Sequence, residues 1–388
     1  MTGQAFKDLL VISIEHAVAA PYCSCKFADA GARVIKIERP EGDFARNYDK
    51  LAGGQSSYFV WLNRGKESIS LAIKQPEDMA LLRSMLARAD VLIQNLSHGA
   101  MARLGLDAET LRAEHPRLIQ CNISGFGEAG PYKDRKAYDL LVQAEAGLAS
   151  ITGTAEAPAR VGVSVCDIAT GMYAYAAILE ALAERGVTGE GAIVDVSMFD
   201  AIADWMTVPL LQARGSGENP PRLGLHHASI APYGAYRCGD GQDVLFAIQN
   251  EREWLDFCIQ VLGKPEVATD ARFSSPSART ANRNELDAII LDVFALSAAS
   301  GILDTLNKAR IANGLVNTVK DVQMHPQLRQ VAVKTGDGIV EMPAAPAIRR
   351  GETRSYGAVP TLNGDGDSIR REFAVQNGNR NQEKGRLT

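Results

Sequence analysis

The sequence predicts an α/β protein with a large domain built on a parallel β-sheet and a smaller α+β domain. Apolar runs of strand length alternate with helical segments over about the first 200 residues, the pattern of a doubly wound parallel sheet. These runs are almost continuously apolar, as expected for strands covered by helices on both faces. After a stretch rich in glycine and proline at residues 215–222, helical patterns predominate.

The first strand is expected at residues 8–14 (DLLVISI) and the second at 33–38 (RVIKIE), with a helix over 22–30 between them. A strand, a helix and a second strand of this length form a βαβ unit, in which the two strands are parallel. The same alternation then continues along the chain. Further strands are expected at 68–73, 90–95, 118–124 and 192–196, and further helices at 76–89 and 198–213.

The second domain is expected at residues 225–320. Its expected elements are a strand at 244–249 and helices at 251–262, 281–296 and 299–312. Residues 1–215 would form the first part of the large domain, and residues 321–388 are expected to return to it. Ligands of open parallel sheets bind outside the carboxyl ends of the strands, so the residues directly after the strands are the most informative.

The composition excludes several classes of protein. A formal net charge of −5 over 388 residues provides no basic field for nucleic acid. No apolar run approaches the roughly 18 residues that would span a membrane, so no span is expected. The first residues, MTGQAFKD, lack the charged start and apolar core of a signal peptide, which predicts a cytoplasmic protein. The six cysteines have no zinc-type spacing, so we expect free thiols and no metal site.

One acid stands out at the start of an alanine-rich helix within residues 159–185. Asp167 lies where this helix is expected to begin, at the N-cap, where unpaired backbone N–H groups and the helix dipole keep a carboxylate ionised. A structural cap is the ordinary role of such a residue. Small neighbours, including Cys166, Ala169 and Gly171, also make it accessible as a carboxylate nucleophile.

Residues 125–130 (GFGEAG) match the glycine pattern of dinucleotide-binding loops. That fingerprint needs its last glycine inside an opening helix, whereas Pro131 and a polar run follow here, so a loop is the better interpretation. Basic residues also follow several expected strands. Together they could form an anion pocket for a phosphorylated ligand, although each alone is ordinary surface. These residues are Lys36, Arg39, Lys74, Arg103 and Lys136.

Seven segments between residues 8 and 201 occur in a characteristic order. They are AAPYCSCKFADAGARVIKIERP, NRGKESISL, DVLIQNL, SGFGEAGP, KAYDLLVQA, DIATGMYA and VDVSMFDA. In this order they resemble the family III CoA-transferases (CaiB/BaiF type), which also include the α-methylacyl-CoA racemases. The resemblance implies a Rossmann-like large domain, a smaller domain and a homodimer of two interlocked chains. It also implies acyl-CoA and a carboxylic acid as substrates, with no permanently bound cofactor.

The resemblance gives roles to residues at matching positions. Asp167 matches the nucleophilic aspartate of the family, which implies an aspartyl-CoA thioester intermediate. The positions that match the CoA-binding residues of the family are Val18, Ala19, Arg39, Leu71, Ala72, Ile73, Lys74, Asn95, Leu96, Ser97, Arg103, Lys136, Ala137, Tyr138 and Asp139.

Tyr138 distinguishes between the two activities of the family. In the racemases resembled here, a histidine that acts as acid and base directly precedes the aspartate of a G-H-D motif, and the matching residues are Ala137, Tyr138 and Asp139. A tyrosine with a pKa of about 10 is a poor base at neutral pH, so the sequence favours CoA transfer over racemisation. An α-methylacyl-CoA racemase and a CoA-binding protein without enzymatic activity are the alternative interpretations.

The expected acceptor is a small dicarboxylate such as succinate, itaconate, mesaconate or citramalate, with succinyl-CoA as a donor. Basic and aromatic side chains could hold its second carboxylate. The candidates are Arg46, Tyr48, His226, His227 and Tyr233. His226 and His227 are adjacent, so in an extended segment their side chains point to opposite faces, and we do not expect them to share a metal.

Overall fold

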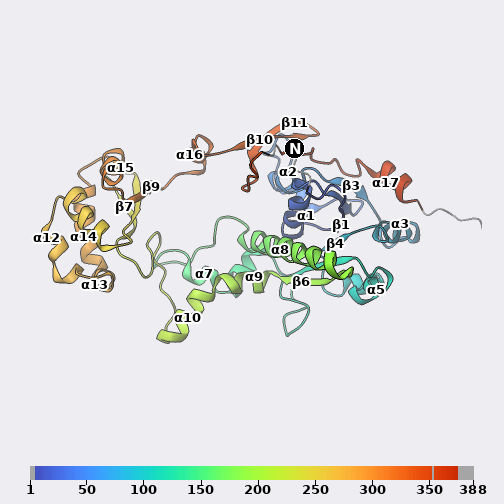
Figure 1. Ribbon diagram of the computed structural model, residues 1–388, viewed down its shortest axis with the longest axis horizontal. Helices are drawn as coiled ribbons and strands as arrows, with labels where there is room; N and C mark the ends of the chain where they lie inside the picture. The colour runs from blue at the N-terminus through green and yellow to red at the C-terminus, as the bar shows by residue number, and fades with distance from the viewer. Residues whose placement is uncertain (1–4, 352–353, 375–388) are drawn as a thin grey trace, which may run out of the picture. The chain divides into compact units, whose positions relative to one another are not determined.

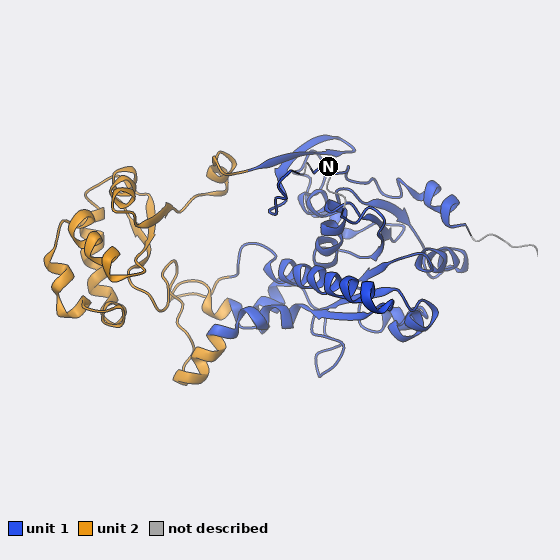
Figure 2. Cartoon of the chain, viewed as in Figure 1, with its two compact units in different colours: residues 1–148, 160–208, 329–388 blue, residues 149–159, 209–328 orange. Residues whose placement is uncertain are grey.

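The computed structural model describes residues 5–351 and 354–374 (Figure 1). The chain forms two compact units, which we describe separately (Figure 2). Unit 1 consists of residues 1–148, 160–208 and 329–388, and unit 2 of residues 149–159 and 209–328. The domain boundaries expected at residues 215, 225 and 320 stay predictions, and the last part of the expected C-terminal segment, residues 375–388, lies outside the described residues.

Unit 1 contains a six-stranded parallel sheet, which confirms the predicted α/β class. Each of the six expected strands is present. They are β1 (Leu10–Ile14), β2 (Arg33–Glu38), β3 (Glu67–Ser70), β4 (Val91–Gln94), β5 (Ile119–Ser124) and β6 (Ile193–Ser197). Most of the apolar residues of the inner strands β1, β4 and β5 are buried between the helix layers on the two faces of the sheet.

The strand order is β3-β2-β1-β4-β5-β6, so the direction of winding reverses between β1 and β4. Such a reversal opens a crevice at the carboxyl ends of the two strands, which is where open α/β sheets bind their ligands. The chain continues past the end of β1 into α1 (Ala19–Asp29) and past the end of β4 into residues 95–99. Residues of these two connections line the functional site.

Helices cover both faces of the sheet (Figure 1). One face packs against α3 (Pro76–Leu86) and α5 (Ala108–Glu114), around a cluster that includes Ile12 and Leu82. The other face packs against α1 and α8 (Val165–Thr188). The expected helix over residues 22–30 therefore exists, but it begins earlier, at Ala19.

Among the described residues, α8 is the one unbent helix long and apolar enough to cross a membrane. Ala174 and Ile178 are fully buried in the cluster that α8 forms with α1 and the sheet, which is the environment of a core helix. Gly171 permits this contact, because a Cβ at that position would lie 2.7 Å from the carbonyl oxygen of Ala19. The two helices therefore approach most closely near the end of α8 that carries Asp167.

The C-terminal part of unit 1 adds a two-stranded antiparallel sheet, β10 (Gln330–Thr335) with β11 (Gly338–Pro343), and the helix α17 (Gly366–Phe373). α17 packs beside α3 and β3. Just before it, Asp365 and Asn363 accept hydrogen bonds from the backbone N–H groups of Ser68 and Ser70, each at 2.9 Å. These contacts satisfy backbone donors on the edge strand β3 that would otherwise be open.

The helix predicted over residues 198–213 is wrong as a single element, because it divides into α9 (Met198–Trp205) and α10 (Thr207–Ser216). Pro209 explains the break. Its ring conflicts with the carbonyl group four residues earlier, which belongs to Trp205, and it has no N–H to donate.

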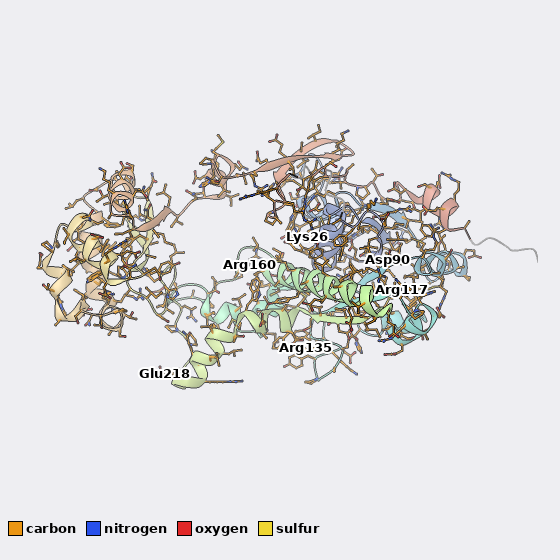
Figure 3. All side chains as sticks on the ribbon, viewed as in Figure 1. Lys26, Asp90, Arg117, Arg135, Arg160 and Glu218 are labelled. Carbon is orange, nitrogen blue, oxygen red and sulfur yellow. The ribbon has the colours of Figure 1, made fainter. Side chains whose placement is uncertain are left out.

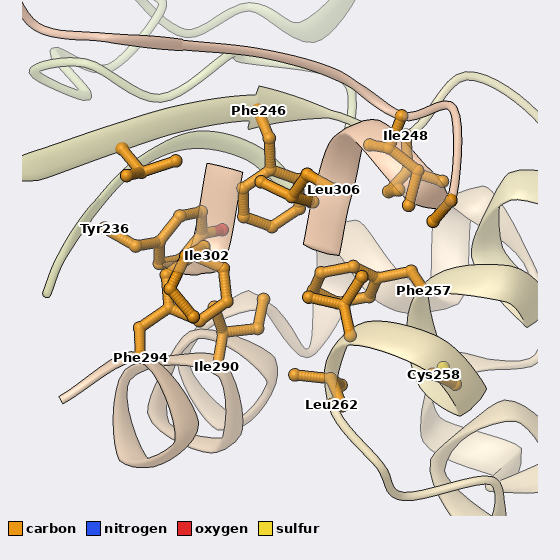
Figure 4. Packing of buried hydrophobic residues seen from close by; sticks show 14 of the residues in the cluster. Tyr236, Phe246, Ile248, Phe257, Cys258, Leu262, Ile290, Phe294, Ile302 and Leu306 are labelled. Carbon is orange, nitrogen blue, oxygen red and sulfur yellow. The ribbon is translucent and has the colours of Figure 1, made fainter. Parts of the chain in front are cut away.

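Unit 2 combines a three-stranded antiparallel sheet with helices, as predicted for a small α+β structure. Its strands are β7 (Tyr233–Arg237), β8 (Asp243–Ala247) and β9 (Ala312–Leu315), and its longer helices are α14 (Arg283–Phe294) and α15 (Ala299–Lys308). An aromatic cluster that includes Tyr236, Phe246, Phe257 and Phe294 fills its core (Figure 4). β9 is absent from the sequence prediction, which extended the preceding helix to residue 312.

Candidate active site

A cavity of about 620 Å³ opens in unit 1 where the winding of the sheet reverses. It is lined by the residues that follow β1, β4 and β5, by residues 133–140 and by the start of α8. His16 and Asn95 connect the first two of these segments across the reversal. The Asn95 side chain accepts from the His16 N–H at 3.0 Å and donates to the His16 carbonyl oxygen at 2.9 Å.

Asp167 lines this cavity, but it is not the N-cap that the sequence predicts. The helix begins three residues earlier than the cap position would require, so Ser164 is the N-cap and Asp167 lies in the first turn. Asp139, 28 residues earlier in the chain, takes the capping role. Its Oδ1 accepts from the backbone N–H groups of Cys166 at 2.8 Å and Asp167 at 3.3 Å. The carboxylate of Asp167 is thereby left free of the cap.

The pKa of Asp167 also differs from the expectation, because it is raised in this cavity. Burial, followed by the charge of Asp139, raises the pKa of Asp167 to about 7, while a hydrogen bond from the Ala19 backbone N–H acts in the opposite direction. The expected N-cap geometry would have lowered the pKa. A carboxyl group with a pKa near neutrality is typical of a site that performs chemistry.

The neighbouring thiol of Cys166 is unsuited to nucleophilic attack. Its residue is fully buried, and burial, followed by the charges of Asp139 and Asp167, raises the pKa of the thiol well above its usual range. The reactive form of cysteine is the thiolate, which is therefore scarce here. Asp167 is the nucleophile candidate that the cavity favours.

Most of the residues matched to CoA binding line the cavity, and the others lie outside it. Those in the lining are Val18, Ala19, Asn95, Leu96, Ser97, Lys136, Ala137, Tyr138 and Asp139. Those outside are Arg39, Leu71, Ala72, Ile73, Lys74 and Arg103. Arg39 lies over the ring of Phe44, 5.7 Å from its centroid, and Phe44 is in the lining. Contact of any of these residues with CoA stays a prediction.

Of the residues expected to contact the acceptor, some line the cavity and others do not. Tyr48 lines the cavity, next to Tyr58, whose hydroxyl lies 3.2 Å from that of Ser164. Arg46 does not line it: its guanidinium donates to Glu38 at 2.6 and 2.8 Å and lies 3.8 Å from the centre of the Phe59 ring. This pair with Glu38 engages the guanidinium of Arg46, and its role in binding an acceptor stays a prediction.

His226, His227 and Tyr233 belong to unit 2. The ring of His227 stacks on that of Tyr233 with 5.1 Å between centroids, and His226 lies 4.0 Å from Asp287. One of the two histidines is half-buried and the other is exposed, in line with their expected alternation. Their role in binding an acceptor stays a prediction.

The structure adds lining residues that sequence reasoning missed, chiefly His16, Tyr58, Arg160 and Ser164. Arg160 lies on the segment that leads into α8 (Figure 3), and one of its Nη atoms donates to the Gly162 carbonyl oxygen at 3.1 Å. His16 directly follows an apolar strand, the position where the fold rule places ligand contacts, so it could have been found from sequence.

No cofactor motif emerges from the remaining candidates. Residues 125–130 form a loop after β5, as predicted, and no helix opens there. Within the described ranges, 5–351 and 354–374, no group of three or more histidine, cysteine or acidic side chains is arranged to hold a metal ion.

A carboxylate at the winding reversal of an open parallel sheet, reached through a large cavity, defines an α/β enzyme that can form a covalent intermediate on an acid side chain. The chain matches the model of CoA-transferase family III over residues 6–366 and belongs to this family. It is therefore an acyl-CoA:carboxylate CoA-transferase, as the sequence predicts.

Three relatives and one solved structure illustrate the similarity. The chain is 37% identical to the acetyl-CoA:oxalate CoA-transferase of Acetobacter aceti, covering 95% of this chain and 96% of the relative. It is 35% identical to the succinate–glutarate CoA-transferase of Agrobacterium fabrum (85% of each chain) and 32% identical to the succinyl-CoA:mesaconate CoA-transferase of Haloarcula hispanica (88% and 87%). A CaiB/BaiF family protein from Brucella suis superposes with a TM-score of 0.83 at 34% identity, covering 94% of this chain and 98% of that one. None of these is named as a racemase.

Proposed function

We propose that this enzyme moves CoA from an acyl-CoA to a small dicarboxylate, with Asp167 as the covalent nucleophile. The observation that carries the proposal is the Asp167 carboxylate in the lining of the cavity, released from helix capping by Asp139. Relatives that act on oxalate, glutarate and mesaconate support a dicarboxylate acceptor, and succinyl-CoA and acetyl-CoA are the donors that their names suggest.

The reaction would proceed through four attacks. The ionised Asp167 attacks the thioester carbonyl, forming an acyl-aspartyl anhydride and releasing CoA thiolate. The thiolate attacks the aspartyl carbonyl, which gives an aspartyl-CoA thioester and the free acid of the donor. The acceptor carboxylate attacks this thioester, forming a second anhydride and releasing the thiolate again. The thiolate attacks the acceptor carbonyl, which yields the new acyl-CoA and restores Asp167. Binding of the CoA tail would keep the thiolate in place throughout.

Isotope exchange tests the function directly. With succinyl-CoA or acetyl-CoA as donor, we expect label from carbon-14 dicarboxylates to enter the acyl-CoA pool, and hydroxylamine to trap Asp167 only when acyl-CoA is present. The acceptor panel contains oxalate, succinate, glutarate, mesaconate, itaconate and citramalate, with acetate and butyrate as monocarboxylates. Exchange of the α-proton without CoA transfer would indicate a racemase, and acceptance of monocarboxylates alone would reject a dicarboxylate acceptor.

Arg160 is a cationic residue of the cavity lining that can bind the second carboxylate of the acceptor, whereas donors of Arg46 are taken by Glu38. A charge-assisted hydrogen bond contributes about 1.5–3 kcal/mol, so Arg160→Gln is expected to raise KM for dicarboxylates by about 10- to 100-fold. KM for acyl-CoA and for a monocarboxylate acceptor should stay within threefold, on the order of 0.6 kcal/mol. Arg112→Gln, at an exposed residue beside Glu190, is the matched control. An unchanged dicarboxylate KM would remove Arg160 from the acceptor site.

The homodimer is a second part of the proposal. α8 leaves apolar surface uncovered, with Met172 52% exposed, and Trp205 of α9 is 46% exposed. Apolar patches of this kind indicate a protein partner, and a second copy agrees with the family resemblance. Light scattering on the purified chain would give the mass, and a monomer at working concentration would reject the dimer. A cytoplasmic location and the absence of a permanently bound cofactor stay predictions.

A further inference from the structure

The loop that brings β1 to the active site contains a residue in an unfavourable backbone conformation. Ala17, which lines the cavity, has φ of +63°. The left-handed region is sterically unfavourable for an L-residue with a Cβ, and such conformations persist only where the surroundings hold them. The conformation of Ala17 therefore depends on contacts from the surrounding chain.

Two side chains from distant parts of the sheet hold this loop. On one side, Asn95 binds both backbone groups of His16. On the other, the Ala17 N–H donates to Asp43 Oδ1 at 3.2 Å. Asp43 lies in the connection after β2 and is 3% exposed, so this hydrogen bond is protected from water. It is the contact that acts on the left-handed residue itself.

Asp43 is in turn fixed on every polar atom. Its Oδ2 accepts from Lys36 Nζ at 2.8 Å, its Oδ1 also accepts from the Ala45 N–H at 2.9 Å, and its own N–H donates to Glu38 at 3.0 Å. The side chains of Lys36 and Asp43 are both 0% exposed. The carboxylate therefore has one orientation available, and that orientation presents Oδ1 to Ala17.

Lys36 also contacts a second buried carboxylate, that of Glu15. Glu15, which directly precedes His16, lies 3.4 Å from Lys36 and 2.6 Å from Lys66, and all three side chains are completely buried. Burial raises the pKa of Glu15, but the charges of Lys66 and Lys36 outweigh this effect and lower the pKa to about 2. The two acids, Glu15 and Asp43, and the two lysines, Lys36 and Lys66, therefore form a buried network without net charge. Replacing buried ion pairs by apolar residues is often neutral or stabilising, so stability alone is a weak reason for this network.

We propose that Asp43, oriented by Lys36, is a positioning residue for CoA transfer: it holds Ala17 left-handed, so that the chain enters α1 with the Ala19 N–H directed at the Asp167 carboxylate. Ala19 and Asp167 line the same cavity, and the Ala19 carbonyl oxygen would lie 2.7 Å from a Cβ at Gly171, one turn of α8 beyond Asp167. At this close approach, a hydrogen bond from the Ala19 N–H favours the ionised form of Asp167. When Asp167 is acylated or carries CoA, the same donor lies beside its carbonyl oxygen, where negative charge develops in each attack. This inference rests on the proposed role of Asp167 as nucleophile.

The experiment separates the Ala17 contact from the ion pair. Lys36→Gln with Asp43→Asn replaces the charges but keeps an amide oxygen for Ala17, whereas Lys36→Gln with Asp43→Ala removes that acceptor in the same neutral background. We expect the first pair to keep kcat within threefold of the native enzyme, and the second to lower kcat at least tenfold with KM for acyl-CoA changed less than threefold. Adding Ala17→Gly to the second pair should restore part of kcat, because glycine adopts the left-handed conformation at no steric cost.

Controls make each outcome decisive. Asp107→Ala removes another aspartate N-cap, that of α5, far from the cavity, and should leave kcat unchanged. Equal kcat values for the two double variants would overturn the positioning role. A lower melting temperature of the second double variant with an unchanged kcat would also overturn it. Failure of the Ala17→Gly rescue would show that Asp43 acts by another route and would also overturn it. If the native enzyme transfers CoA and forms the hydroxylamine-sensitive adduct, any of these failures concerns Asp43 alone and leaves the proposed function intact.

Discussion

Asp167→Asn is expected to reduce kcat for CoA transfer by at least about 10³-fold, because an amide cannot form the covalent anhydride on which the proposed cycle depends. The substitution preserves the shape of the side chain, so the cavity and the α8 cap provided by Asp139 remain. We therefore expect Kd for CoA, measured by calorimetry, to change less than threefold, or about 0.6 kcal/mol. Glu180→Gln, an exposed acid on the same helix, is the control and should retain full activity.

The same variant carries a second signature, in stability. In the folded protein the pKa of Asp167 is about 7, against an ordinary value of 3.8, so the folded state holds its proton more tightly than the unfolded state. Below about pH 4 both states are protonated and the group has no effect. Between about pH 4 and pH 7 the unfolded state releases this proton while the folded state keeps it, so the free energy of unfolding falls as pH rises over this range. Above pH 7 the fall is complete, and the native enzyme carries a buried charge.

Asp167→Asn has no such charge, so its free energy of unfolding should exceed that of the native enzyme at pH 8, by up to about 4 kcal/mol from the cited shift. Denaturant titrations at pH 4 and pH 8 measure this difference. A variant that is inactive and also less stable than the native enzyme at pH 8 would indicate that Asp167 supports the fold and is not a strained nucleophile.

The strands could be predicted from the sequence because short segments rich in apolar residues alternate with helical patterns, and all six predicted segments overlap a strand. The order of the sheet could not, since apolar runs carry no information about which strands are neighbours. That order determines the site: the reversal between β1 and β4 brings His16 to Asn95, which are 79 residues apart in the chain. The predicted helix boundaries were wrong where a single residue determines them, as Pro209 does for the break between α9 and α10.

The proposed nucleophile could be identified from the sequence, but its environment could not. A local rule gave Asp167 the N-cap role, whereas the fold supplies a cap from Asp139. Likewise, Arg46 has the right charge for an acceptor site, and only the structure reveals its ion pair with Glu38. The cap of α8 comes from a residue 28 positions before Asp167, and no local pattern identifies it.

The pH dependence of kcat/KM tests the raised pKa of Asp167. Asp167 must be ionised to attack, so we expect kcat/KM to fall about tenfold for each pH unit below a pKa of about 7. Two other groups of the cavity lining have shifted pKa values. Burial, followed by the charge of Asp43, raises the pKa of Tyr48 to about 12, so it stays neutral, and burial lowers the pKa of His16, which keeps the imidazole uncharged near pH 7.

Asp139→Asn should move this acid limb to lower pH. The charge of Asp139 is the second cause, after burial, of the raised pKa of Asp167, so removing it lowers that pKa and leaves more nucleophile ionised at pH 6. The asparagine oxygen can still accept from the N–H groups of Cys166 and Asp167, which keeps the cap. Asp139→Ala removes both the charge and the cap, so it should shift the limb and also lower the plateau. If the limb of Asp139→Asn coincides with that of the native enzyme, a group other than Asp167 controls the reaction below pH 7, and the assignment of the nucleophilic step must change.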